Sequence, residues 1–299
     1  MFQRNAKVVQ NILIAEKTWL LELECPEIAQ KIFPGQFVML RVKETFDPLL
    51  NRAFALYDVC HSPTHHYFGI QIVYVRIGKM TNLLSEIQPG ESLDIIGPLG
   101  KPFLDSEEYS KNNKLISSDK RYSEIATFIA GGIGQTPFRS WWRFLLGEES
   151  YNGKSISKPI EKIYFFWGAR AVSFFGRLED FSSTKIEIFL ATEDGSKGFR
   201  GRVTDHFFNL FHPQIHPEKS PGLIYACGPE PMLEGLGKWC VSHNLICFLS
   251  LESPMACGYG VCNTCVVKIG NPSLWDYQKI CVDGPAFLAN DIVWDNQSN

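Results

Sequence analysis

Four cysteines near the end of the sequence have the spacing of ligands to a metal cluster. Cys257, Cys262 and Cys265 stand within CGYGVCNTC, and Cys281 follows Cys265 after fifteen further residues. A C-x4-C-x2-C run followed by a distant fourth cysteine is the ligand pattern of plant-type [2Fe–2S] clusters. The two glycines between the first two cysteines would let the backbone turn tightly and bring N–H groups towards the sulfides.

Two other interpretations of these cysteines are weaker. A structural zinc site usually shows two C-x2-C pairs, and here only Cys262 and Cys265 form such a pair. Disulfides are disfavoured if the protein is cytoplasmic, because thiols there stay reduced. An iron–sulfur cluster is therefore the preferred interpretation, with zinc and disulfides as alternatives.

Composition argues against several classes of partner. The chain has 299 residues, 45% of them hydrophobic, and a formal net charge of -3. Without a long run of one charge sign, nothing suggests nucleic acid or an anionic membrane surface as a partner. The opening MFQRNAKVVQNILIAEK lacks the apolar core of a signal peptide, and no apolar run is long enough to span a bilayer. We therefore expect a cytoplasmic protein that binds neither nucleic acid nor membrane.

Two glycine- and proline-containing turns are candidates for binding a nicotinamide dinucleotide. AGGIGQTPF (130–138) follows an apolar run and precedes a possible helix, so its backbone could approach a pyrophosphate. YACGPEPM (225–232) would place a rigid corner at the carboxyl edge of a sheet, where ligands of α/β proteins bind. A plain turn and a buried cysteine are the alternatives to a binding role. The candidate residues of these two turns are Gly132, Gly134, Thr136, Cys227, Gly228, Pro229 and Met232.

The sequence divides into four parts and predicts a multidomain protein. Residues 1–103 contain six short apolar runs separated by turns, which predict a closed antiparallel β-barrel with one helix near 79–87. Residues 104–124 are polar and predict a linker or insertion. Residues 125–250 alternate strands with helices, which predicts an α/β domain with a parallel sheet. Residues 251–299 form the small C-terminal cluster segment.

Together these features resemble the ferredoxin–NADP reductase superfamily. ESPMACGYGVCNTCVVK and KICVDGPAF narrow the resemblance, from about residue 5 to 295, to electron-transfer subunits of class 1B dihydroorotate dehydrogenases. The resemblance implies FAD on the barrel, NAD(H) on the α/β domain and a [2Fe–2S] cluster on the ferredoxin-like segment. It also implies an FMN-containing catalytic subunit as partner in a heterotetramer of pyrimidine biosynthesis. Electrons would pass between that subunit and NAD through the cluster and FAD.

The family's first flavin motif, Arg-Pro-x-Ser, is incomplete here. It lines up with Arg52-Ala53-Phe54-Ala55. The resemblance implies that Arg52 binds the FAD pyrophosphate. Ala55 lacks the hydroxyl that the family places beside the flavin ring.

The family's second flavin stretch is a Tyr-Arg pair followed by Gly-Thr. Here a methionine replaces one glycine, and Arg76 is a candidate to replace the displaced arginine. A half-buried strand aromatic is the alternative interpretation of Tyr74. The residues that line up with this stretch are Val73, Tyr74, Val75, Gly78, Met80 and Thr81.

An acidic turn bears on the choice of nucleotide. In TEDG (192–195), carboxylates at a strand end accept hydrogen bonds from ribose hydroxyls and repel a 2′-phosphate. Glu193 and Asp194 therefore predict NAD rather than NADP. The neighbouring cations Lys197, Arg200 and Arg202 argue in the other direction.

No acid–base side chain is needed for this chemistry, so the sequence predicts no catalytic residue. Nicotinamide exchanges hydride, an iron–sulfur cluster exchanges single electrons, and a flavin exchanges both. One rival function is an NADH-dependent reductase for ferredoxin, a sulfur compound or an oxygenase. A zinc-stabilised binding module that has lost its flavin is the second rival, which Ala55 and Met80 keep open.

Overall fold

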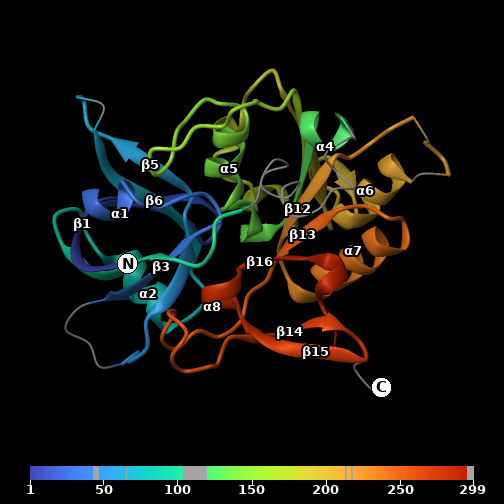
Figure 1. The fold of residues 1–299 in the computed structure, drawn as a ribbon. Coiled ribbons are helices and arrows are strands. Elements are labelled where there is room, and N and C mark those ends of the chain that lie inside the picture. Colours follow the sequence, from blue (N-terminus) through green and yellow to red (C-terminus); the bar gives the residue numbers. More distant parts are fainter. Residues whose placement is uncertain (43–46, 65, 104–119, 213, 217, 295–299) are drawn as a thin grey trace.

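A computed structural model describes residues 1–42, 47–64, 66–103, 120–212, 214–216 and 218–294. Within them, two seven-stranded sheets lie side by side, with a two-stranded hairpin beneath the second (Figure 1). The first sheet is drawn in blue and teal, and the hairpin in red. No helix in the described residues is long and apolar enough to cross a membrane.

The first sheet is antiparallel throughout, as predicted. Its order is β4-β3-β7-β1-β2-β6-β5, and no pairing between the described residues joins β4 to β5. The sheet is therefore a half-barrel, and the expectation of a closed barrel was wrong. Its strands are β1 (Phe2–Ala15), β2 (Thr18–Glu24), β3 (Phe37–Val42), β4 (Arg52–Ala55), β5 (Asp58–His61), β6 (Tyr67–Val75) and β7 (Ser92–Leu99).

The sheet has seven strands rather than six because the run RAFALYDV divides. β4 pairs with β3 at one edge of the sheet, and β5 pairs with β6 at the other. Leu56 and Tyr57, both fully buried, carry the chain between these edges. The predicted helix is present as α2 (Lys79–Glu86), and a short helix, α1 (Pro26–Ala29), follows β2.

The second sheet has the order β11-β10-β9-β8-β12-β13-β16, and all pairs except β13–β16 are parallel. This confirms the predicted α/β class. Continuous apolar runs such as IATFIAGG form these strands because helices and the first sheet cover both faces. The strands are β8 (Ile125–Gly131), β9 (Lys162–Ala169), β10 (Ile186–Thr192), β11 (Phe199–Arg200), β12 (Leu223–Cys227), β13 (Cys247–Ser250) and β16 (Ala286–Leu288).

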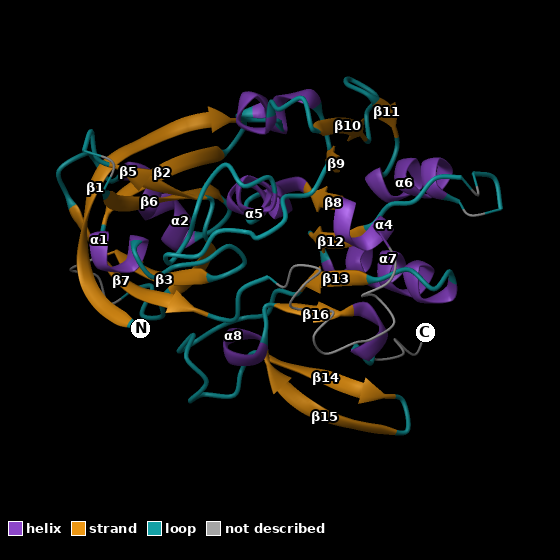
Figure 2. Cartoon of the chain, turned by 45° about the horizontal axis from the view of Figure 1, so that its top comes forward, coloured by secondary structure: helices purple, strands orange, loops and turns teal. Residues whose placement is uncertain are grey.

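Three longer helices accompany the second sheet: α5 (Phe138–Leu145), α6 (Val203–Phe211) and α7 (Glu230–Ser242). A 3-10 turn, η1 (Gly132–Gln135), joins β8 to α5, and a second, η3 (Leu178–Phe181), lies between β9 and β10. Most side chains of α5 are buried. This burial is expected of a helix packed between the two sheets, and Figure 2 shows α5 in that place.

The cluster segment joins the second sheet rather than standing apart from it. Cys265 is followed by the hairpin β14 (Val266–Asn271) and β15 (Leu274–Lys279), then by α8 (Ile280–Asp283). β16 then pairs antiparallel with β13 (Figure 2). The predicted domain boundary at residue 250 stays a prediction. The β13–β16 pairing joins the segments on its two sides.

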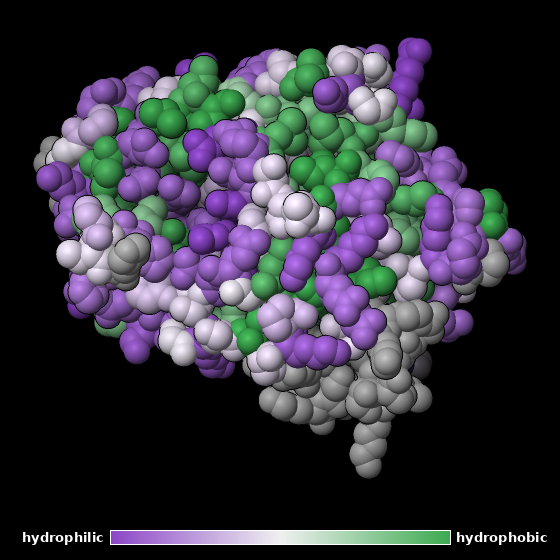
Figure 3. Space-filling model, turned by 90° about the horizontal axis from the view of Figure 1, so that it is seen from above, coloured by the Kyte–Doolittle hydropathy of each residue, from purple (hydrophilic) through white to green (hydrophobic). Residues whose placement is uncertain are grey.

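Most of the predicted insertion at 104–124 lies outside the described residues. Its last part is a short helix, α4 (Lys120–Glu124), that leads into β8. Figure 3 views the molecule from the side of β5 and α5. Polar side chains cover much of this face, and apolar ones gather in the upper middle of the view.

Candidate cofactor sites

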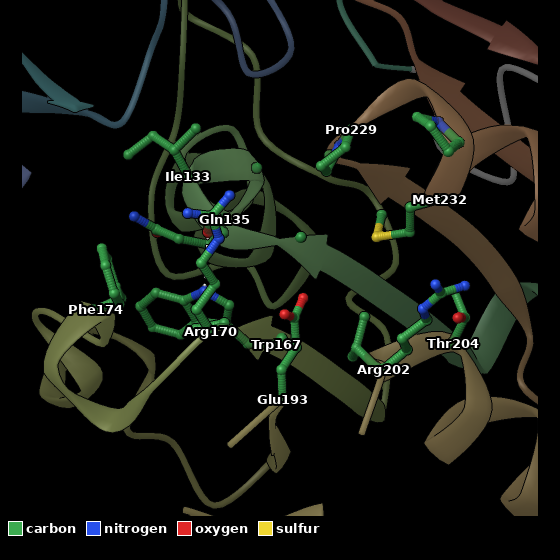
Figure 4. Close-up of a pocket in the computed structure, with 18 of the residues that line it drawn as sticks. Ile133, Gln135, Trp167, Arg170, Phe174, Glu193, Arg202, Thr204, Pro229 and Met232 are labelled. Atoms are coloured by element: carbon green, nitrogen blue, oxygen red, sulfur yellow. Dashed lines mark hydrogen bonds between the residues drawn. The ribbon is translucent and has the colours of Figure 1, made fainter. Parts of the chain in front are cut away.

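A cleft of about 860 Å³ opens between the two sheets at the carboxyl ends of β8, β9, β10 and β12. This edge is where α/β sheets bind dinucleotides. Both sheets contribute, since Val75 and Ile77 from the end of β6 line the cleft with residues of the second sheet. In Figure 4, Pro229 and Met232 stand across the cleft from Phe174.

The GGIGQTP turn forms one wall of this cleft. Gly132 and Gly134 line it. Gly132 has φ +56°, and its carbonyl oxygen accepts a hydrogen bond of 2.9 Å from Trp167 Nε1. Thr136 does not line the cleft: it is buried, and its hydroxyl donates to the carbonyl oxygen of Ile133 at 3.0 Å. Thr136 therefore stabilises the turn rather than presenting a group to a ligand.

The CGPEPM corner forms the opposite wall. Gly228, Pro229 and Met232, which the sequence made candidates for nucleotide binding, line the cleft. Cys227 does not line it, and burial raises the pKa of its thiol. The alternative interpretation of Cys227 as a small buried side chain fits the structure.

The acidic turn contributes one carboxylate rather than two. Glu193 lines the cleft, and in Figure 4 its carboxylate points into the cavity. Asp194 Oδ1 instead accepts hydrogen bonds from Ser196 N at 2.9 Å and Ser196 Oγ at 2.6 Å. These hydrogen bonds lower the pKa of Asp194, so Asp194 is a turn residue.

Among the cations near this turn, Arg202 lines the cleft, whereas Lys197 and Arg200 do not. Sequence reasoning missed Arg170, which lines the cleft just beyond the end of β9. The carboxyl end of the KIYFFWGAR strand was the signal that could have identified it. The cleft thus combines Glu193, suited to ribose hydroxyls, with the positive charges of Arg170 and Arg202, which suit phosphate groups.

Glu252 is a further carboxylate in the cleft, and sequence reasoning missed it. It follows β13, lines the cleft and is open to solvent there. The protein that surrounds it on its other sides raises its pKa by desolvation. It stands near the CGPEPM corner, at the opposite end of the sheet order from Glu193.

The first flavin motif lies on an accessible edge strand. Arg52 on β4 is exposed, and its Nη1 donates to the carbonyl oxygens of Leu50 and Asn51 at 3.0 and 3.1 Å. Its Nε and Nη2 groups have no partner among the described residues, so they remain available to a pyrophosphate. Ala53 is exposed, and Phe54 and Ala55 are half-buried.

The second flavin stretch divides between surface and core. Gly78 is the N-cap residue of α2, where the first N–H groups of the helix suit a phosphate. The Thr81 hydroxyl accepts hydrogen bonds from the backbone N–H groups of Ile77 and Gly78 at 3.0 and 3.1 Å. Lys79 forms an ion pair with Asp47, which brings the loop before β4 to this helix end. Arg52 and the α2 N-terminus therefore fit the diphosphate of FAD.

Three predicted flavin residues belong to the core instead. Val73 and Met80 are buried. Tyr74 is 2% exposed and donates its hydroxyl to Asn11 Oδ1 at 3.0 Å. Its ring also meets Phe54 edge-on at 6.0 Å between centroids, which ties β6 to β4. Because the Met80 side chain points inwards, its replacement of a family glycine leaves the α2 N-terminus open.

The four predicted ligands of the cluster come together as two pairs. Cys262 lies within hydrogen-bonding reach of Cys257, and Cys281 within reach of Cys265. The hairpin produces the second pair, because it returns the chain so that Ile280 N donates to the carbonyl oxygen of Cys265 at 2.7 Å. The fifteen residues between the last two cysteines therefore bring Cys281 back beside Cys265.

The two pairs differ in electrostatics. The Thr264 hydroxyl lies 3.0 Å from Cys262 Sγ and, with the Thr264 backbone and Cys257, lowers the pKa of Cys262 to about 6. Burial and the neighbouring Cys265 raise the pKa of Cys281 to about 12, against a hydrogen bond from the Gly260 backbone. Only Cys262 is exposed, so it is the thiolate best placed to meet an incoming iron.

The glycines of the cysteine loop are required by shape. Gly258 has φ +81° and Gly260 φ +90°. A Cβ atom on Gly258 would lie 2.6 Å from Met39 Cγ of β3, and one on Gly260 would lie 2.6 Å from Val282 Cγ2. The cysteine loop is thereby packed directly on the flavin sheet.

The paired arrangement fits a binuclear cluster better than a single ion. A structural zinc ion takes four ligands at one point, whereas a [2Fe–2S] cluster takes two on each iron.

Comparison with known protein families identifies three matching models. The oxidoreductase FAD-binding domain matches residues 5–103, and the oxidoreductase NAD-binding domain matches residues 128–238. The iron–sulfur cluster binding domain of dihydroorotate dehydrogenase B matches residues 252–293. These matches confirm the predicted cofactors FAD, NAD(H) and an iron–sulfur cluster.

Two curated relatives and one solved structure extend the comparison. The dihydroorotate dehydrogenase B (NAD(+)) electron transfer subunit of Geobacillus thermodenitrificans is 34% identical over 287 residues, 96% of each chain. That of Desulforamulus reducens is 30% identical over 292 residues, 97% of this chain and 98% of the relative. A structure of an NADH-dependent reduced ferredoxin-NADP oxidoreductase shares the fold, with a TM-score of 0.75 and 22% identity over 97% of this chain and 90% of that one. With these relatives and the three domain matches, the chain belongs to the family of electron transfer subunits of dihydroorotate dehydrogenase B.

Proposed function

We propose that the chain passes electrons between NAD(H) and a catalytic dihydroorotate dehydrogenase subunit in pyrimidine biosynthesis, in the cytoplasm. The partner would carry FMN, and two copies of each subunit would form a heterotetramer. FAD and the [2Fe–2S] cluster, when bound, supply the exchange between hydride and single electrons. The chain's own residues would bind these groups, hold them apart from one another and leave them accessible to their reaction partners.

The cleft supports the nicotinamide end of this proposal. Gly132 and Gly134 let the backbone approach a pyrophosphate, and Arg170 and Arg202 add positive charge beside it. Glu193 is placed to accept hydrogen bonds from ribose hydroxyls. The other half of the dinucleotide would then extend towards Pro229 and the flavin sheet.

The observation that carries the proposal is the exposed surface of the cysteine loop around Cys262. Cys262 is exposed, and it is flanked by apolar side chains that are also exposed: Tyr259 at 46%, Val261 at 72% and Val282 at 42%. An apolar surface at a redox site is typical of a protein interface. This surface is where the catalytic subunit would dock and receive or donate electrons.

A reconstituted two-subunit assay tests the proposal. The chain is mixed with the catalytic subunit, and NAD⁺ reduction by dihydroorotate is followed. Turnover should require both proteins. Val261→Glu should slow this coupled reaction at limiting partner concentration while leaving flavin reduction by NADH unchanged, because buried charge disfavours docking.

Leu274→Glu is the matched control for Val261→Glu. Leu274 is 78% exposed but lies at the far tip of the hairpin, away from the four cysteines. The Leu274→Glu variant should support the coupled reaction at the wild-type rate. Full NADH oxidation with a ferredoxin, and none with the dihydroorotate-oxidising subunit, would instead support the reductase alternative.

A further inference from the structure

The segment that leaves the FAD-binding strand makes direct contact with the helix that follows the NADH-binding turn. β4 ends at Ala55, and β5 begins at Asp58. The two residues between them are fixed within the first sheet, because Leu56 N donates to Gln36 O at 3.1 Å and Tyr57 N to Gln71 O at 2.9 Å. Their position is therefore tied to that of the flavin motif.

Tyr57 holds the beginning of α5 through its backbone. The N–H of Ser140, the third residue of α5, donates to the Tyr57 carbonyl oxygen at 2.9 Å. The first N–H groups of a helix have no intrahelical partner. The first sheet thus supplies the acceptor for α5, the helix that starts directly after GGIGQTP.

Asp58 holds the same helix through its side chain, which is 5% exposed. Asp58 Oδ2 pairs with Arg143 Nη1 at 2.8 Å and with Arg139 Nε at 3.3 Å, both on α5. Asp58 Oδ1 accepts a hydrogen bond of 2.7 Å from the hydroxyl of Tyr151. Buried charge networks of this kind have strongly preferred geometries, because a broken partner leaves a desolvated charge.

A second contact extends the network to η3. The Tyr57 hydroxyl donates to Asp180 Oδ2 at 2.7 Å. Arg177 binds both Asp180 oxygens at 3.0 Å, and Arg139 donates to the Asp180 carbonyl oxygen. Neither Tyr57 nor Asp58 lines the nucleotide cleft. Their contacts join the two domains without forming part of either binding surface.

From these contacts we infer that Tyr57 and Asp58 are positioning residues, which set the distance between the nicotinamide site and the flavin site by anchoring α5 to the first sheet. The inference rests on the proposed function, since it concerns hydride transfer between the two sites. Hydride donor and acceptor must approach to about 3–3.5 Å, and a misplacement of about 1 Å can cost about 100-fold in rate. A rigid bridge from Ala55 to α5 meets this requirement.

Asp58→Asn tests the inference by stopped-flow reduction of the FAD-loaded protein. The saturating rate of flavin bleaching by NADH should fall about 10-fold, as expected for a loosened donor–acceptor geometry. The NADH concentration for half-saturation should change less than about 2-fold, because the cleft residues are untouched. A smaller folded fraction would reduce the amplitude of bleaching, whereas mispositioning reduces the rate constant.

Amide hydrogen exchange of residues 138–145 supplies a readout that needs no turnover. Exchange in this segment should be faster in Asp58→Asn than in the wild type, because the anchor of α5 is weakened. Should Asp58→Asn fail to fold, Tyr151→Phe removes one hydroxyl and no charge, and should show the same changes in smaller measure.

Tyr67→Phe is the matched control. The Tyr67 hydroxyl also crosses between the domains, donating to the Ser150 carbonyl oxygen, but it contacts the loop beyond the end of α5. It should bleach at the wild-type rate. An unchanged rate and unchanged exchange in Asp58→Asn would overturn the inference. A wild-type flavin that NADH fails to reduce would overturn the proposed function instead.

Discussion

The backbone of Gly134 lies directly against the carbonyl oxygen of Cys227: a Cβ atom built on Gly134 would be 2.1 Å from that oxygen. The two turns proposed to bind the nucleotide, at the ends of β8 and β12, are therefore in backbone contact. Any side chain at position 134 would push these strand ends apart and change the shape of the cleft between them.

Gly134→Ala should abolish reduction by NADH while leaving the other cofactors bound. We expect the rate of flavin bleaching to fall by about 100-fold or more, because the wall of the cleft moves by roughly an ångström. FAD and iron content should stay at wild-type levels. Gly235→Ala is the control, since it also lines the cleft but its Cβ meets nothing within 4 Å. If NADH bleached the flavin of Gly134→Ala at the wild-type rate, the assignment of this turn to NADH binding would be contradicted.

Cys262→Ser should remove the cluster without removing the nicotinamide–flavin reaction. The variant should lose both irons and acid-labile sulfide, because Cys262 is the low-pKa, exposed member of its pair. NADH should still bleach the flavin, and coupled turnover with the catalytic subunit should stop. The control variant Cys60→Ala replaces a buried cysteine on β5 and should retain the wild-type iron content. Full partner turnover by an iron-free variant would refute the assigned exit of electrons.

Glu193→Gln should weaken the preference for NADH over NADPH. Removing the charge in the cleft lessens repulsion of a 2′-phosphate and weakens hydrogen bonds to ribose, which together are worth about 10-fold in the ratio of bleaching rates. Asp194→Asn should leave that ratio unchanged, because Asp194 binds Ser196 rather than the cleft. A wild type that is reduced equally fast by NADPH would refute the assignment of Glu193.

The charge of Asp180 should stabilise the protein at neutral pH, and this contribution should be lost in acid. Burial alone would raise the pKa of Asp180, but hydrogen bonds from Arg177 and Tyr57 outweigh it and lower the pKa. The stabilisation is therefore complete at neutral pH and is lost as the pH falls through the folded-state pKa, below the ordinary value of about 3.9.

Asp180→Asn should accordingly unfold about 1–3 kcal/mol more easily at pH 7, with the difference shrinking below about pH 4. Urea unfolding at a series of pH values measures this difference. Glu179→Gln, a neighbour with a 70% exposed side chain, should differ from the wild type by less than about 0.5 kcal/mol. A constant difference between Asp180→Asn and wild type down to pH 3 would show that Asp180 is not the titrating group.

The sequence predicted the fold class because most strands have a recognisable local sequence pattern. The run GLIYAC ends at a glycine–proline corner, and VTDHFFNLF alone specifies α6 within its observed bounds. The cysteine spacing predicted four candidate ligands, and the fold brings them together as two pairs. The hairpin that returns Cys281 was not predicted, because the residues 266–279 give no strong period.

Other features depend on contacts far apart in the sequence. The apolar run in RAFALYDV continues through Leu56 without a turn residue, so its pattern cannot show that the chain changes edges there. Motif positions likewise do not reveal which side chains face a ligand. Asp194 and Cys227 fall inside nucleotide motifs, yet the first stabilises a turn and the second packs in the core. Met80 replaces a family glycine, yet its side chain is buried in the core.

The pairing of β16 with β13 has a consequence for chains that never acquire iron. β16 covers a strand edge whose N–H and C=O groups would otherwise be open to pairing with other molecules. The strand follows Cys281 within a few residues, so loosening of an unloaded cysteine loop can uncover this edge. Failed cluster delivery would then threaten the protein's solubility as well as its electron transfer.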